Sequence, residues 1–332
     1  MRDLYNLHEF YNKGKNSKQL NNRRKSFGYQ VLGFGSGVAA IAGNDNGIFG
    51  FGYNGSSRVS MTNLVSNVGV VATDTTGVGT ARDAPGATQY GEDKGIFAYG
   101  RTAGGPTVTA TSNLVSNSGV IASDVTGVGT TRYGLAACSY GTDKGIFAYG
   151  ESGSGYISTS NLVSNAGVVA ADVSGVGDAR VLLAATEYGT DTAIFAFGYG
   201  PSHEWDTRSN LVSNVGVIAT DVSHSGGTGR QAPGGCKYGG NKGIFAYGYN
   251  ASGSMSTSQL VSNVGVIGAN VSGVGSARDA TNACEYGQDK GIFAYGGGPV
   301  NMSNLVSNVG VVSADVTGVG TARQYPGACS YN

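Results

Sequence analysis

The chain is poor in the residues on which catalytic and metal sites most often depend. Among its 332 residues there are 3 histidines, 4 cysteines, 1 tryptophan and 6 prolines, and only 13% of the residues are charged. The histidines, His8, His203 and His224, stand in unrelated contexts, so neither a histidine metal cluster nor a Ser-His-Asp arrangement is expected. The sequence therefore predicts a protein that is not an enzyme and that holds no cofactor and no metal.

Long apolar runs are also missing. No stretch approaches the roughly 18 apolar residues that a membrane-spanning helix needs. The basic N-terminal stretch is followed by SFGYQVLGFGSG (26–37), which lacks the apolar segment of a secretory signal peptide. We therefore expect no membrane span. If the protein acts outside a cell, it must leave the cell by a route other than general secretion.

Glycine is abundant, whereas the charged residues that helix surfaces normally carry are scarce. There are 58 glycines, against a usual share of about 7%, and no G-X-Y period that would indicate collagen. Hydrophobic residues make up 40% of the chain, enough for a sizeable core. This composition predicts an all-β protein.

One unit of sequence occurs six times. The string (K/T)-(G/A)-I-F-A-(Y/F)-G begins at Lys94, Lys144, Thr192, Lys242 and Lys290, and a diverged copy, NGIFGFG, begins at Asn46. The string (N/Q)-L-V-S-N begins at Asn63, Asn113, Asn161, Asn210, Gln259 and Asn304. An arginine also recurs at one equivalent position of each unit: Arg82, Arg132, Arg180, Arg230, Arg278 and Arg323. A period of about 49 residues is typical of the four-stranded blades of β-propellers.

Four strands are expected in each unit, illustrated by residues 132–178. They are strand A (132–140), a tight turn (141–144), strand B (145–150), strand C (158–164) and strand D (168–173). Strands A and B are apolar at consecutive positions, which predicts burial on both faces of the sheet. We therefore expect a basic, glycine-rich N-terminal arm over residues 1–46 and a six-bladed β-propeller over residues 47–332.

The unit resembles the kelch repeat of β-propellers over most of residues 47–331. The resemblance rests on the order R-x-x-x-x-A, a glycine-containing hairpin, the I-F-A-Y-G strand, a variable loop, the turn S-N-x-G and an x-x-R connection. It implies kelch-like blades stacked around an axis.

The last unit ends on a strand A that has no strand B after it. Its residues 323–331 are expected to pair with residues 47–52, which would close the ring. A rival is SGVAAIAGND (36–45), which resembles strand A without its arginine, and the sequence leaves both open.

Two repeated residue types are interpreted as structural. Five of the six arginines follow an aspartate by eight or nine residues (Asp74, Asp124, Asp172, Asp221 and Asp315), and Asn270 stands in the remaining unit. Pairs between them would join neighbouring blades. The cysteines, Cys138, Cys236, Cys284 and Cys329, share their position with Thr88 and Thr186, which predicts small buried side chains without a disulfide.

Sequence variation is concentrated between strands B and C, in segments that should emerge on one face. Differing loops on a rigid scaffold are typical of binding surfaces; drift in unconstrained loops is the alternative. The candidate ligand-binding residues are Arg58, Arg101, Tyr156, His203, Trp205 and Arg208.

The N-terminal stretch differs from the rest in charge. Residues 1–25 carry seven basic and two acidic side chains, a charge of +5, so the rest carries −5 because the total is 0. The basic residues are Arg2, Lys13, Lys15, Lys18, Arg23, Arg24 and Lys25. They are candidate assembly anchors, and a soluble disordered end is the alternative.

Two functions remain open. The near-identical units and SFGYQVLGFGSG resemble the adhesive domains and anchoring ends of phage structural proteins. That resemblance implies a virion component, a capsid decoration or a tail or fibre part, which meets other virion proteins through the arm and a host-surface glycan or protein through the propeller. The alternative is a cytoplasmic kelch-like binding module for a protein or glycan. Nucleic acid is not expected as a partner, and the oligomeric state is open.

Overall fold

The computed structural model describes residues 44–332 except 103–106, 202–203 and 225. These residues belong to one compact unit of antiparallel strands, and they include no helix. The all-β fold is therefore confirmed. The arm expected over residues 1–46 lies outside the described residues up to residue 43, and so do its seven candidate anchors.

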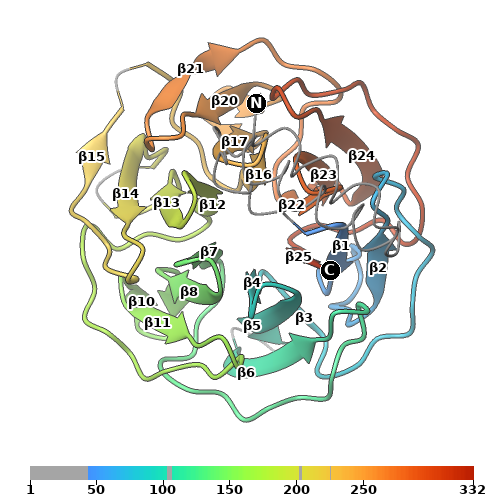
Figure 1. The fold of residues 1–332 in the computed structure, drawn as a ribbon, viewed down its shortest axis with the longest axis vertical. Coiled ribbons are helices and arrows are strands. Elements are labelled where there is room, and N and C mark those ends of the chain that lie inside the picture. The colour runs from blue at the N-terminus through green and yellow to red at the C-terminus, as the bar shows by residue number, and fades with distance from the viewer. Residues whose placement is uncertain (1–43, 103–106, 202–203, 225) are drawn as a thin grey trace, which may run out of the picture. The chain divides into compact units, whose positions relative to one another are not determined.

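Six sheets, one for each sequence unit, follow one another around a common centre in Figure 1. The first contains β25 (Gly327–Tyr331), β1 (Asn46–Gly50) and β2 (Thr62–Val65). The second contains β3 (Arg82–Asp83), β4 (Gly86–Tyr90), β5 (Lys94–Thr102) and β6 (Val108–Val115), and the third β7 (Ala136–Tyr140), β8 (Lys144–Ala148) and β11 (Ser160–Val163). The fourth contains β12 (Ala184–Tyr188), β13 (Thr192–Ala196), β14 (Arg208–Val212) and β15 (Val222–Ser223). The fifth contains β16 (Gly234–Tyr238), β17 (Lys242–Ala246), β20 (Ser258–Val261) and β21 (Ile267–Val271), and the sixth β22 (Asn282–Tyr286), β23 (Lys290–Gly296) and β24 (Val300–Val306). Two short hairpins join β9 (Glu151–Ser152) to β10 (Gly155–Tyr156) and β18 (Tyr249–Asn250) to β19 (Gly253–Ser254).

The predicted strand D is regular in only two sheets, as β15 and β21. In the other sheets segment D meets strand C at isolated bridges, such as Val163 with Val169 and Ser160 with Val173. Between these bridges a side chain also links the two segments, because Asn161 Nδ2 donates to the carbonyl of Ala170 at 2.9 Å. The repeated asparagine of strand C therefore adds a hydrogen bond to segment D.

Strand B is buried on both faces, as its apolar run predicts. The side chains of Ile96, Phe97, Ala98 and Tyr99 in β5 are all fully buried. The aromatic rings of successive B strands meet edge to face, as Tyr99 and Phe147 do with ring centroids 5.4 Å apart. Each sheet therefore packs its aromatic residues directly against the next sheet.

The four cysteines are free and buried, as expected for small core side chains. The side chain of each unit's cysteine or threonine points at one position of strand B in a neighbouring sheet. Five of the six units have glycine at that position. A Cβ added to Gly95, for example, would lie only 2.5 Å from Cys329 Sγ. The close approach of the sheets explains this glycine.

Two closed rings of backbone hydrogen bonds link the six sheets. In the first ring each N–H donates to the carbonyl of the equivalent residue in the preceding sheet, at 2.7–3.0 Å. Its members are Ala84, Gly134, Leu182, Ala232, Ala280 and Tyr325. In the second ring, at 2.7–3.1 Å, donors in the A–B turns bond to the next sheet; the donors are Gly91, Gly141, Gly189, Gly239, Gly287 and Asn332.

The expected pairing of the C-terminal strand with residues 47–52 is confirmed. β25 pairs antiparallel with β1, and Cys329 lies opposite Ile48. β2 occupies the other edge of β1, so both edges are filled. The rival segment, residues 36–45, lies outside the described residues up to residue 43.

The arginines are buried, but the expected aspartate partners are wrong. Arg323 Nη1 lies 3.9 Å from Asp74, and Arg82 Nη1 lies 3.9 Å from Asp124, so each arginine meets the aspartate of its own sheet. The reason is that Asp74 turns back toward its own sheet, accepting hydrogen bonds from Asn63 at 2.9 Å and from Thr321 Oγ1 at 2.7 Å. Arg180 with Asp221 and Arg278 with Asp315 follow the same rule.

The arginines nevertheless contact the neighbouring sheet, through aromatic rings. Arg132 Nη2 donates to Asn161 Oδ1 of its own sheet at 2.7 Å, and its guanidinium lies 4.1 Å from the ring centre of Tyr99 in the preceding sheet. All six arginines repeat this stacking, at 3.8–5.4 Å. Stacking on an aromatic ring, rather than an ion pair, joins the arginine to the adjacent sheet.

Candidate functional site

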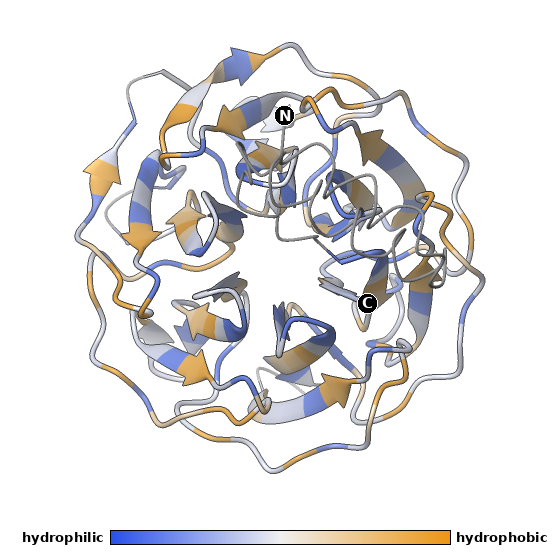
Figure 2. Cartoon of the chain, viewed as in Figure 1, coloured by the Kyte–Doolittle hydropathy of each residue, from blue (hydrophilic) through white to orange (hydrophobic). Residues whose placement is uncertain are grey.

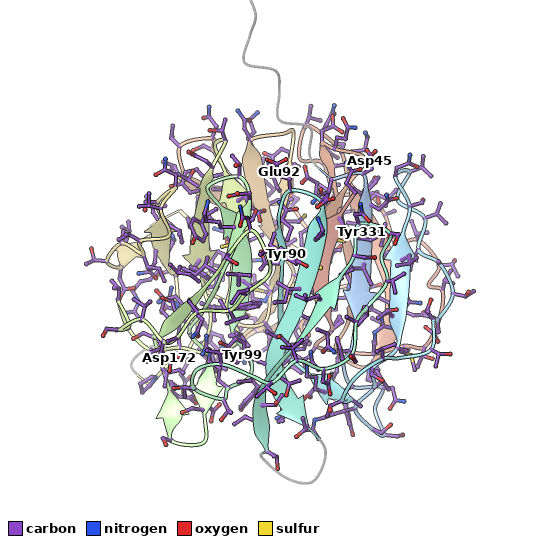
Figure 3. The ribbon with its side chains drawn as sticks, turned by 60° about the horizontal axis from the view of Figure 1, so that its bottom comes forward. Asp45, Tyr90, Glu92, Tyr99, Asp172 and Tyr331 are labelled. Carbon is purple, nitrogen blue, oxygen red and sulfur yellow. The ribbon has the colours of Figure 1, made fainter. Side chains whose placement is uncertain are left out.

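The six sheets share two opposite faces. We call the face that carries the A–B turns (such as 91–93) and the C–D turns (such as 165–167) the turn face. Asn117 of a C–D turn donates to Asp93 of an A–B turn at 3.3 Å, so both kinds of turn lie at the same end. The segments between strands B and C lie at the other end, which we call the loop face. In Figure 3, Asp45 and Glu92 mark the turn face, and Tyr99 lies toward the loop face.

Two candidate ligand-binding residues meet on one carboxylate of the loop face. Arg58 Nε donates to Asp83 Oδ1 at 2.9 Å, and Arg101 Nη2 donates to Asp83 Oδ2 at 2.8 Å. Asp83 is almost fully buried, whereas the side chain of Arg101 keeps 31% of its surface exposed. The hydrogen bonds to Asp83 raise the pKa of Arg101. The buried carboxylate thus fixes two cationic side chains at the surface.

A third candidate, Tyr156, belongs to the same row of side chains. Arg101 lies 4.8 Å from the ring centre of Tyr133, whose hydroxyl donates to Glu151 Oε2 at 2.6 Å. Glu151 pairs across the strands with Tyr156, which meets Tyr199 edge to face at 5.9 Å. Burial and the hydrogen bond to Glu151 raise the pKa of Tyr133. We call Arg58, Asp83, Arg101, Tyr133, Glu151, Tyr156 and Tyr199 the loop-face row.

The other three candidates lie elsewhere or cannot be placed. Arg208 is not an exposed anchor, because only 11% of its side chain is exposed and it donates to Asp206 Oδ2 at 2.6 Å and to Asp178. Asp206 is itself buried, and this ion pair raises the pKa of Arg208. Trp205 is half-buried, and its Nε1 has no hydrogen-bond partner among the described residues. His203 lies outside the described residues.

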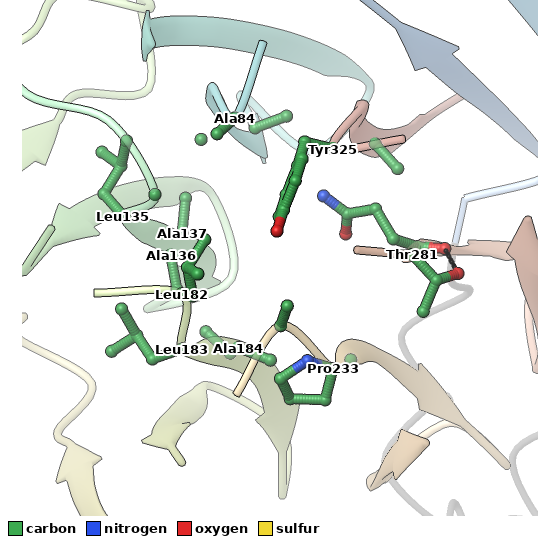
Figure 4. Close-up of a pocket in the computed structure, with 18 of the residues that line it drawn as sticks. Ala84, Leu135, Ala136, Ala137, Leu182, Leu183, Ala184, Pro233, Thr281 and Tyr325 are labelled. Atoms are coloured by element: carbon green, nitrogen blue, oxygen red, sulfur yellow. Dashed lines mark hydrogen bonds between the residues drawn. The ribbon is translucent and has the colours of Figure 1, made fainter. Parts of the chain in front are cut away.

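A cavity opens near the first hydrogen-bond ring, with a volume of about 80 Å³. Small and apolar side chains from all six sheets line it, and Figure 4 shows the ring of Tyr325 pointing into it. A second cavity, of about 40 Å³, is lined by Glu187, Lys237 and Glu285 among others. Glu285 is buried, and its Oε1 has no hydrogen-bond partner among the residues that the structure describes.

Sequence reasoning missed Asp83, Tyr133, Glu151 and Tyr199. The residue after each unit's arginine pairs with the residue after strand B, as Asp83 pairs with Arg101 and Tyr133 with Glu151. A comparison of the six units at these two positions would have revealed complementary residue types. Aspartate faces arginine in one unit, and tyrosine faces glutamate in the next. The register needed to see these pairs was not evident from spacing alone.

Comparisons with known proteins leave the family open. No protein-family model matches the chain, and no curated protein matches it significantly. Within the described ranges, no group of three or more histidine, cysteine, aspartate or glutamate side chains is placed to hold a metal ion. Nor do these ranges contain a helix with the length and apolar character that crossing a membrane requires.

Proposed function

We propose that residues 47–332 form a six-bladed propeller of kelch-like blades, and that the protein is a non-enzymatic virion component that binds a host surface. Capsid decoration and a tail or fibre part are the two candidate locations. The propeller is supported by the six sheets and by the two hydrogen-bond rings, each of which returns to its first sheet.

The observation that carries the functional proposal is the opposition of the two faces. The first described residues, Asn44 and Asp45, lie at the turn face, where the carbonyl of Asp45 accepts a hydrogen bond from the N–H of Gly287 at 2.9 Å. The segments that differ between units lie on the loop face. A chain attached at one face would present the varied side chains of the other face outward.

The turn face also repeats an exposed apolar side chain six times. The residue that follows each C–D turn is a valine with 60–64% of its surface exposed: Val70, Val120, Val168, Val217, Val266 and Val311. Figure 2 shows hydrophobic colour at several places along the outer segments of the chain. Exposed apolar residues that recur in this way are typical of a contact surface, and they support attachment through the turn face.

The proposal is tested by labelling purified virus particles with an antibody against the full chain, and by comparing a variant that lacks residues 1–43. We expect the full chain on particles, and the shortened chain absent from them although it melts at the same temperature. Equal labelling with the shortened chain would contradict attachment through the arm. A chain confined to the cytoplasm would instead support a cellular binding module.

A further inference from the structure

We propose that the loop-face row binds an uncharged pyranose sugar, with Tyr156 and Tyr199 as the stacking surface and Glu151 as the hydrogen-bond acceptor. This inference rests on the proposed function of the loop face, and it names the class of ligand.

The row is continuous because its residues are cross-strand neighbours. Glu151 pairs with Tyr133 on one side and with Tyr156 on the other, and directly opposite residues in antiparallel strands point to the same face of a sheet. Arg101 extends the row beyond Tyr133 at 4.8 Å, and Tyr199 extends it beyond Tyr156 at 5.9 Å. Tyr133, Glu151, Tyr156 and Tyr199 are all half-buried, so they are fixed in place and still reachable by a ligand.

The chemistry of the row fits a ring that is apolar on its faces and polar at its edge. Tyr156 and Tyr199 meet edge to face, so the ring that contributes its edge keeps both of its own faces free of the other. Such a face can stack on the C–H groups of a sugar. Glu151 Oε1 accepts no hydrogen bond from a described residue, which leaves it available to a sugar hydroxyl.

The charge of the row favours a neutral ligand. Two guanidinium groups, of Arg58 and Arg101, stand against two carboxylates, of Asp83 and Glu151. A carboxylate beside tyrosine rings could also attract an organic cation. However, Arg101 already lies 4.8 Å from the Tyr133 ring, and it would repel a second cation there. We therefore favour the sugar.

The test is saturation-transfer NMR with the full chain and a panel of methyl pyranosides of glucose, galactose, mannose and N-acetylglucosamine. We expect transfer to the C–H protons of one sugar face, with an affinity in about the millimolar range. Tyr156→Ala should weaken binding at least about tenfold. Glu151→Gln should weaken it less, because the amide still offers an acceptor oxygen. Tyr249→Ala, which removes an exposed tyrosine outside the row, is the matched control and should bind like the full chain.

Three results would overturn the inference. They are no transfer to any sugar of the panel, sugar binding unchanged by Tyr156→Ala, and tighter binding of choline that is lost in Glu151→Gln. Tyr156→Phe, which keeps the ring, should retain binding, and an unchanged melting temperature of Tyr156→Ala should show that this variant is folded. Adhesion of the full chain to host cells separates the two proposals: adhesion without sugar binding overturns only the ligand class, whereas loss of adhesion overturns the function.

Discussion

The backbone N–H of Ala84 donates to the carbonyl of Tyr325 at 2.9 Å, so the second sheet is bonded to a residue close to the end of the chain. Both residues have positive φ, 49° for Ala84 and 52° for Tyr325, and the equivalent residues of the other four sheets do too. A left-handed backbone at six equivalent positions turns each N–H toward the preceding sheet. This conformation costs free energy at the five positions that are not glycine. In return, it allows the six N–H groups to form the closed ring of hydrogen bonds.

The first prediction concerns a buried arginine. Arg132→Met removes the hydrogen bond to Asn161 Oδ1 and the stacking on Tyr99, and it leaves a buried amide oxygen unsatisfied. We expect the free energy of unfolding to fall by about 3 kcal/mol, measured by urea denaturation. Arg58→Met is the control: Asp83 keeps its ion pair with Arg101 in this variant, so the loss should be smaller, about 1 kcal/mol. Equal losses in the two variants would contradict a special role for the repeated arginine.

The second prediction concerns Arg208, which the sequence marked as a candidate ligand-binding residue. Because Asp206 is buried beneath it, Arg208→Ala leaves a carboxylate without its cation. We expect a loss of about 3 kcal/mol in the free energy of unfolding, and thermal melting followed by circular dichroism measures it. The paired change Arg208→Ala with Asp206→Ala should restore part of this loss. An unchanged melting temperature in Arg208→Ala would show that the ion pair is not structural.

The third prediction is a pH dependence from Glu285. Burial raises the pKa of this carboxyl to about 8, with Lys237 lowering it and Glu187 raising it further. Because the folded-state pKa of Glu285 lies above the unfolded value of 4.5, the folded protein holds the proton more tightly than the unfolded chain does. The contribution of this proton to the free energy of unfolding is therefore fully present below pH 4.5, and it is lost as pH rises toward 8.

Glu285→Gln keeps the shape of the side chain and removes its ionisation. We expect it to raise the free energy of unfolding at pH 9 by more than about 1 kcal/mol, and to change it little at pH 4. Denaturant titrations at the two pH values measure the difference. Glu92→Gln, at an exposed glutamate, is the control for the substitution itself. A Glu285→Gln variant with the same stability as the full chain at pH 9 would contradict the prediction.

How far the sequence could predict the molecule depends on whether a feature is local or crosses between sheets. The strands β5 and β8 and the buried cysteines follow from residue types at fixed offsets, and the pairing of β25 with β1 follows from counting repeats. The partner of Arg82 does not follow, because Asp74 and Asp124 occupy equivalent positions in successive units. Only the path of the chain decides which of them lies beside it.

The sequence predicted that the variable loops share one face, but it did not predict which of their side chains contact one another. Variation marked Arg58, Arg101 and Tyr156 correctly as residues of that face. Their connection through Asp83 and Glu151 depends on strand register and on contacts between sheets. The burial of Arg208 was not evident from the sequence, because its contact with Asp206, two residues away, forms in a segment without regular pairing.

The most direct test is the removal of residues 323–332, because β25 completes the first sheet and Tyr325 and Asn332 each take part in one of the two hydrogen-bond rings. Without β25 the edge of β1 loses its partner, and Arg323 and Tyr325 are lost from the contacts between sheets. An unpaired apolar edge favours association.

We expect the shortened chain to lose its cooperative thermal transition and to associate, as followed by circular dichroism and light scattering. Removal of Asn332 alone, which breaks one hydrogen bond of the second ring, is the matched control and should melt within a few degrees of the full chain. A chain lacking residues 323–332 that stays monomeric and melts like the full chain would contradict closure by the C-terminal strand.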